Sequence, residues 1–157
     1  MTGMIGVNVS TTYAALGPAT PQLGARYMDE TGKEWIFVQD SGSGITAQYV
    51  ATFNRAHSAA MLSTSNDARG DRVGVPSVAL GASEYGWVQV YGPASFRVLA
   101  SAVANVRLNT TGTAGALDDD GTATSMQVQG IYLTTTNGGA AAVTAGILNY
   151  PFVDVTL

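Results

Sequence analysis

The chain has 157 residues and a formal net charge of -4, and only 11% of its residues are charged, against about 25% in an average soluble domain. Ala, Gly, Thr and Ser account for 71 residues, yet the chain is 46% hydrophobic with two tryptophans, which excludes a disordered composition. The lack of cysteine excludes disulfides and thiolate chemistry. The scarcity of Lys and Arg argues against a nucleic-acid or anionic-membrane partner.

The charges are distributed unevenly along the chain. No charged side chain occurs in residues 1–25 or 121–153, so 17 of the 18 charges lie in residues 26–120. Residues 1–25 also lack the basic start of a secretory signal, and the apolar stretch 140–153 is too short to span a bilayer. We therefore expect a soluble protein made in the cytoplasm, with neutral ends and a solvated middle.

Residues 1–22 are predicted to form an extended N-terminal arm, followed by a single β domain over residues 23–157. Two prolines within four residues favour extended, non-helical chain, and an edge strand is expected around residues 5–9. A disordered terminus, or a strand of the main domain, is the alternative. The residues expected to contact a partner are Val7, Val9, Tyr13, Leu16, Pro18 and Pro21.

Strand signals are dense after the arm. Asp29 to Lys33 reads as a turn with Gly32 at positive φ, and the β-branched and aromatic residues 34–39 follow it, which together predict a hairpin. Short strands are then expected at 72–80, 85–91, 96–99, 106–110, 125–128, 131–135, 142–148 and 152–157. Short strands separated by Gly, Pro, Asn and Asp predict an all-β fold, a small barrel or sandwich of antiparallel strands.

Residues 47–62 are ambiguous. The segment AQYVATFNRAHSAAML contains no Gly or Pro, and Tyr49, Phe53, Ala56 and Ala60 fall near helical spacing. A short helix and a strand with a loop are both compatible with this pattern.

One motif has the spacing of a dinucleotide fingerprint. Residues 42–47, GSGITA, follow a predicted strand, and Asp67 lies twenty residues beyond Ala47. A doubly wound fold needs several further helices, whereas the chain after Gly70 shows only short strands and turns. A flexible hairpin loop is the favoured interpretation, and no cofactor is expected.

Catalytic and metal signals are weak. His57 is the sole histidine and no serine lies in a Gly-x-Ser-x-Gly elbow, so we expect a surface or interface histidine and no enzyme. Residues 118–121, DDDG, lack the alternating ligands of a calcium loop and read as an exposed turn, so no metal is expected. Residues 69–71 spell Arg-Gly-Asp and are interpreted as a polar loop.

Several segments resemble the capsid decoration (cement) proteins of tailed bacteriophages. The first is residues 23–39, LGARYMDETGKEWIFVQ, with its leucine-glycine pair, short hairpin and aromatic strand. The most specific is residues 84–92, EYGWVQVYG. Matching shorter pieces are VGV at 73–75, AGALD at 114–118 and Tyr150-Pro151.

This resemblance implies a structural virion protein on the capsid exterior, made in the host cytoplasm. It implies a small all-β domain, commonly a homotrimer, that binds the major capsid protein and stabilises contacts between its copies. No catalytic residue is implied. Neutral surfaces fit this role because they are desolvated without burying unpaired charge. The arm is therefore expected to contact the shell or a neighbouring subunit, by packing and by strand addition.

A second contact surface is expected in the charge-free block 121–153. Its apolar residues are expected to divide between core and subunit contact: Ile131, Leu133, Val143, Ile147 and Leu148. Paired core strands with threonine on the wet face are the alternative. The alternative function is a virion-displayed fibre or host- or glycan-recognition module, for which Trp87, Gln89 and Tyr91 on one strand face are the candidate cluster.

Overall fold

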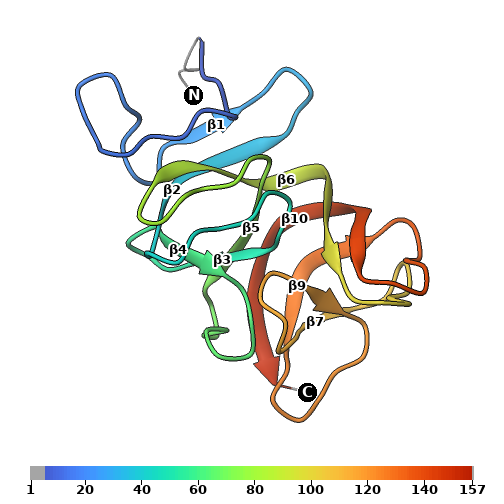
Figure 1. The fold of residues 1–157 in the computed structure, drawn as a ribbon. Coiled ribbons are helices and arrows are strands. Elements are labelled where there is room, and N and C mark those ends of the chain that lie inside the picture. The colour runs from blue at the N-terminus through green and yellow to red at the C-terminus, as the bar shows by residue number, and fades with distance from the viewer. Residues whose placement is uncertain (1–5, 157) are drawn as a thin grey trace.

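The structure is a computed structural model that describes residues 6–156, and over that range it contains strands but no helix (Figure 1). The first five strands are β1 (Arg26–Met28), β2 (Glu34–Asp40), β3 (Ala51–Phe53), β4 (Ser58–Met61) and β5 (Arg72–Pro76). The others are β6 (Tyr85–Val98), β7 (Leu108–Thr110), β8 (Leu117–Asp118), β9 (Met126–Leu133) and β10 (Ala142–Thr156). The predicted all-β class is confirmed.

The strands close into two rings that share β6. One ring runs from β6 through β2, β4, β3 and β5 back to β6, and the other through β8, β7, β9 and β10 back to β6. β5 also pairs with β10, which links the rings a second time. The pairs are antiparallel except β2 with β4 and β6 with β8, so the expectation of purely antiparallel strands is corrected at one pair in each ring.

The long strands bend where they pass from one neighbour to the next. β6 pairs with β2 over residues 85–91 and with β10 over residues 91–98, and Gly92 at the crossing has a φ of +94°. In β10 the register with β9 shifts between Leu148 and Phe152, opposite Gly130. A Cβ on Gly130 would lie 2.5 Å from the carbonyl oxygen of Asn149, so this close crossing requires glycine.

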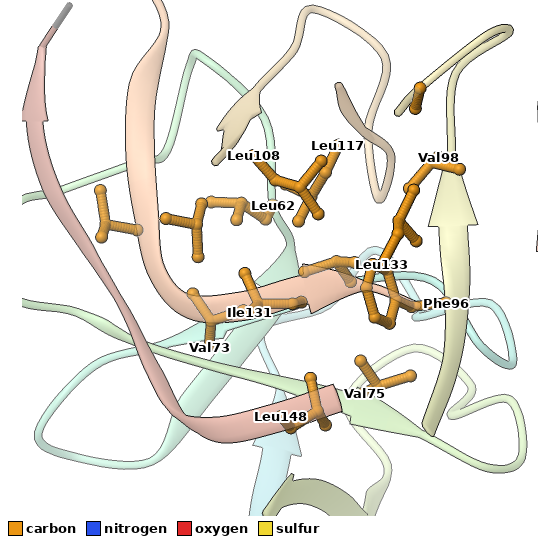
Figure 2. Close-up of a cluster of buried hydrophobic side chains, with 14 residues drawn as sticks. Leu62, Val73, Val75, Phe96, Val98, Leu108, Leu117, Ile131, Leu133 and Leu148 are labelled. Carbon is orange, nitrogen blue, oxygen red and sulfur yellow. The ribbon is translucent and has the colours of Figure 1, made fainter. Parts of the chain in front are cut away.

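Each ring encloses its own hydrophobic core. In the first ring Ile36, Val38, Phe53 and Val88 are at most 1% exposed. In the second, side chains from β6 to β10 converge with Leu62 from the first half of the chain (Figure 2). Val73 and Val75 of β5 also point into this second core (Figure 2), so the two rings pack as one unit.

Of the two structures compatible with residues 47–62, the short helix is not formed and the strand with a loop is. Residues 51–53 and 58–61 are β3 and β4, an antiparallel pair with Phe53 opposite Ala59. The turn between them is set by Asn54, whose side-chain oxygen accepts the backbone N–H groups of Ala56 at 2.9 Å and Ser58 at 3.2 Å. Strand pairing on both sides overrides the helical spacing of the sequence.

The hairpin predicted around Gly32 is confirmed. β1 and β2 pair with Tyr27 opposite Trp35, and Gly32 turns the chain with a φ of +81°. The Asp29 carboxylate accepts backbone N–H groups from Thr31 at 2.9 Å and Lys33 at 3.0 Å, and the Trp35 Nε1–H at 3.1 Å. One aspartate thus fastens the turn to the strand that follows.

Candidate functional site

Residues 6–13 of the predicted arm lie against the domain that follows. Val7, Val9 and Tyr13 pack on a cluster of buried aromatic side chains on the outer face of β2 and β6, which consists of Trp35, Phe37 and Trp87. Tyr13 and Tyr85 exchange backbone hydrogen bonds of 2.9 and 2.8 Å. No strand forms over residues 6–9, and residue 5 of the expected edge strand lies outside the described residues.

The second half of the arm projects a neutral tip. Residues 14–19, here called the arm tip, are all exposed, and Leu16 is 46% exposed. Thr20 closes the turn, because its Oγ1 accepts the Gly17 N–H at 2.9 Å and donates to the Gly17 carbonyl at 2.8 Å. Of the six predicted contact residues, Leu16 and Pro18 are exposed here and Pro21 is half-buried.

A second neutral surface lies on the outside of the second ring. β6, β10 and β9 run side by side there, and their outward residues form rows across the three strands. We call this surface the neutral face; it comprises Pro93, Ser95, Tyr132, Thr134, Val143, Ala145 and Ile147. Tyr132 and Val143 are each 40% exposed.

Two basic residues, Lys33 and Arg97, border the neutral face, and Lys33 lines the same hollow as Pro93 of that face. Val143 lies opposite Arg97 of β6. The Arg97 Nη1 donates to the Tyr49 hydroxyl at 2.7 Å, and its guanidinium sits 4.7 Å from the Tyr49 ring centroid. An arginine held in this way does not project freely from the surface, so the uncharged residues of the neutral face are bordered by one restrained arginine and by Lys33.

The candidates in the block 121–153 divide between core and surface. Ile131, Leu133 and Leu148 are core residues at 3%, 0% and 0% exposure, whereas Val143 and Ile147 point outward. Sequence reasoning missed Tyr132 and the β6 residues of the neutral face. The alternation of apolar and other residues over 131–134 could have predicted that Tyr132 points outward. The pairing of β6 with β10 could not be predicted in this way, because the two strands are distant in sequence.

The Trp87 cluster proposed for glycan recognition is not an exposed cluster. Trp87 is fully buried under the arm and Gln89 is 5% exposed, which leaves Tyr91 at 39%. Tyr91 stacks instead on Tyr150, with ring centroids 5.1 Å apart, and the Tyr150 hydroxyl donates to Glu34 at 2.7 Å. Hydrogen bonding to Glu34 and burial raise the pKa of Tyr150 above its ordinary value.

The glycine-rich loop at residues 42–47 is occupied by an internal carboxylate. The buried Asp40 Oδ2 accepts the N–H groups of Gly42 at 2.7 Å, Gly44 at 2.9 Å and Ser83 at 3.0 Å. Two of the amides that a phosphate would need are thus already used. The predicted hairpin loop is wrong in its connection, because the loop joins β2 to β3, which do not pair with each other, and its Ile45 pairs with Leu80 instead.

The candidate catalytic histidine and the candidate metal-binding aspartates lie in different parts of the fold. His57 is half-buried in the β3–β4 turn with a φ of +61°, and burial together with Arg72 and Arg26 lowers its pKa below 6.5. Asp118 lies on β8, and burial followed by the neighbouring carboxylates raises its pKa. Within residues 6–156 no three acidic or histidine side chains are grouped to hold a metal ion.

The Arg69-Gly70-Asp71 sequence forms a tight surface turn. Gly70 has a φ of +88° and its N–H donates to the Val153 carbonyl at 2.8 Å. The Arg69 Nε and the Asp154 Oδ1 form an ion pair at 3.5 Å. The turn is therefore attached to β10 as well as leading into β5.

Comparisons with known proteins give no assignment. No protein-family model, curated protein or solved structure matches this chain. The part of the chain that the structure describes contains no helix with the length and apolar character needed to cross a bilayer. The functional expectation therefore depends on the sequence motifs and on the surfaces described above.

Proposed function

We propose that this chain is a structural protein of a bacteriophage virion that binds the outer surface of the capsid. In this role it stabilises contacts between major capsid proteins and acts as a homotrimer. The observation that carries the proposal is the position of the exposed apolar side chains. Of the ten large hydrophobic side chains that are exposed within residues 6–156, five lie in the two charge-free blocks of the chain: Leu16, Tyr132, Val143, Tyr150 and Phe152.

Surfaces of this composition suit a protein that is covered on assembly. Burying an unpaired charge costs roughly several kcal/mol of desolvation free energy, whereas desolvating neutral Thr, Ala and Pro side chains costs much less. Repetition over a symmetric shell multiplies a modest affinity at each site. A protein with two neutral surfaces can use one for its own copies and the other for the shell.

We assign the neutral face to contacts between subunits and the arm tip to the shell. The neutral face is a rigid three-stranded surface, which suits the fixed geometry of a symmetric oligomer. The arm tip projects from the aromatic cluster that anchors the arm, and its exposed residues are free to insert between capsid subunits. The anchoring residues Val7, Val9 and Tyr13 hold the tip in place.

Co-sedimentation with expanded phage heads tests the assignment of the arm tip. We expect the wild-type protein to pellet with the heads and Leu16→Asp to bind at least tenfold more weakly, because it places a charge in a neutral contact. Val103→Asp is the matched control, since Val103 is 42% exposed but lies outside both surfaces. Equal binding by Leu16→Asp and wild type would contradict the assignment.

A second candidate is a virion-displayed module that recognises host glycans. The stacked Tyr91 and Tyr150 rings beside the Glu34 carboxylate favour it, because sugars bind on aromatic faces next to hydrogen-bonding groups. A glycan array distinguishes the two functions. Signals that Tyr91→Ala removes and Tyr132→Ala retains would support this alternative, and a blank array would leave the capsid role.

A further inference from the structure

Three of the seven Lys and Arg residues gather with the sole histidine at one end of the first ring. Arg55 and His57 lie in the β3–β4 turn, and Arg69 and Arg72 flank the turn that leads into β5. These residues line a cavity of about 480 Å³, in which Asp71 is the one acidic lining residue. Arg26 is also close enough to influence His57. This concentration of positive charge stands out in a chain with a net charge of -4.

Two of these arginines have no internal partner. Arg26 pairs with Glu34 at 3.0 Å, and Arg69 with Asp154 at 3.5 Å. Within residues 6–156, the side chains of Arg55 and Arg72 make no ion pair or hydrogen bond. A guanidinium presents its N–H groups as a planar fork that matches the oxygens of a carboxylate or a phosphate.

The walls of the cavity are held in place by the fold. The His57 ring stacks on Phe53 with centroids 6.3 Å apart, and a Cβ on Gly24 would lie 2.5 Å from its Cε1. Asn54 fixes the turn that carries Arg55 and His57. On the opposite wall, the Gly70 N–H binds the Val153 carbonyl. The basic side chains therefore project from two fixed turns rather than from mobile chain.

We propose that this cavity is an oxyanion-binding site, in which the unpaired guanidinium groups of Arg55 and Arg72 bind a carboxylate or phosphate group beside the His57 ring. The site is separate from the neutral face and from the arm tip, so it does not depend on capsid binding. The source of the oxyanion is either a free anion such as inorganic phosphate or an acidic peptide segment.

The sole histidine offers a direct reporter of occupancy. Arg72 and Arg26 place positive charge near His57, although Arg26 is paired with Glu34. Arg55, Arg69 and Arg72 line the cavity with His57; Asp71 is its acidic lining residue, and Asp154 pairs with Arg69. An anion bound among them offsets that charge and raises the pKa of His57. Binding in turn tightens as the pH falls and the imidazole is protonated.

NMR of the His57 ring protons tests the proposal at constant ionic strength. The full chain is titrated with inorganic phosphate, with hexaglutamate and with hexaglutamine as the neutral control. We expect a saturable shift of the His57 signals with at least one of the two anions and none with hexaglutamine. Arg55→Gln and Arg72→Gln should each weaken binding at least tenfold, whereas Arg107→Gln, an exposed arginine outside the cavity, should not.

The two anions distinguish the source of the oxyanion. Saturation by phosphate alone identifies a small-anion site, and tighter binding of hexaglutamate identifies an acidic protein segment as the ligand. If Arg72→Gln disturbs the fold, Arg55→Gln in the exposed turn remains the decisive variant. The proposal is overturned if neither anion gives a saturable shift, or if Arg107→Gln weakens binding as much as Arg55→Gln does.

Discussion

At the scale of single residues, two aspartates organise the turns before and after β2, namely Asp29 and Asp40. Asp40 is 2% exposed, and one of its oxygens accepts three backbone N–H groups from the loops at 41–44 and 81–84. A buried donor that loses its partner costs about 1–3 kcal/mol. Asp40 therefore contributes to stability by accepting backbone hydrogen bonds from both loops.

We predict that Asp40→Ala lowers the free energy of unfolding by about 3 kcal/mol or more, since three donors lose their acceptor. Urea denaturation measures the change. Asp120→Ala in the exposed turn after β8 is the control and should leave stability nearly unaltered. A loss similar to that of the control would show that water satisfies the loops in place of Asp40.

Asp29 gives the protein a dependence of stability on acid pH. Burial raises its pKa, but hydrogen bonds from Thr31, Trp35 and Lys33 outweigh burial and hold the pKa below 3.8. A lowered pKa in the folded state stabilises the fold above pH 3.8, and this contribution is lost as the pH falls through the folded-state pKa.

We therefore expect Asp29→Asn to have a lower melting temperature than wild type at pH 7, with the difference narrowing below pH 3.8. Thermal unfolding followed by circular dichroism across this range measures it. A difference that does not depend on pH would contradict the role assigned to the charge. Glu30→Asn, in the same turn but exposed, should match wild type throughout.

At the scale of elements, Gly and Pro mark bends inside strands as well as breaks between them. The expected pairs 85–91 with 96–99 and 142–148 with 152–157 are single strands, β6 and β10, although residue 157 lies outside the described residues. A local pattern shows that the chain changes direction but not whether the ladder continues. Continuity depends on partners such as β2 and β9, which are distant in sequence.

The β3–β4 hairpin is a second case in which a local sequence pattern does not determine the structure. Its residues have helical spacing and no Gly or Pro, and the signal against a helix is the single Asn54, which caps the turn. The hairpin is stable because β2 and β5 pair with its two edges. Those pairings are long-range, so a window of sixteen residues does not contain them.

The arm is the element whose two halves differ most in their expected response to mutation. Tyr13 packs edge-on against Phe37, with centroids 5.8 Å apart, whereas Leu16 is exposed. We predict that Tyr13→Ala costs about 2 kcal/mol of stability and Leu16→Ala less than about 0.5 kcal/mol. Chemical denaturation measures both. Equal effects would mean that the arm does not pack on the domain in solution.

At the scale of the whole molecule, the contact surfaces were only partly foreseeable. The sequence predicts that residues 1–25 and 121–153 are neutral, and the structure divides residues 6–25 and residues 121–153 each into a packed part and an exposed part. Val143 and Leu148 are both apolar residues of β10, but alternation of the strand buries one and exposes the other. The basic cavity was not predicted, since its arginines come from two separate turns.

The neutral face leads to a prediction about assembly. We expect light scattering to give three times the chain mass of 16.1 kDa for wild type and a monomer for Val143→Lys. A lysine at position 143 lies opposite Arg97, so its charge has no partner of opposite sign there and opposes burial. Val103→Lys should remain trimeric. A monomeric wild type at high concentration would contradict a trimer preformed through this face.

The central claim is that the chain decorates the outside of a phage head, and a cryo-electron microscopy reconstruction of expanded heads incubated with the purified protein tests it most directly. The account predicts added density on the outer surface in groups of three, with the arm tip directed toward the shell and the neutral faces meeting at the three-fold centre. Heads that show no added density at saturating protein concentration would contradict it.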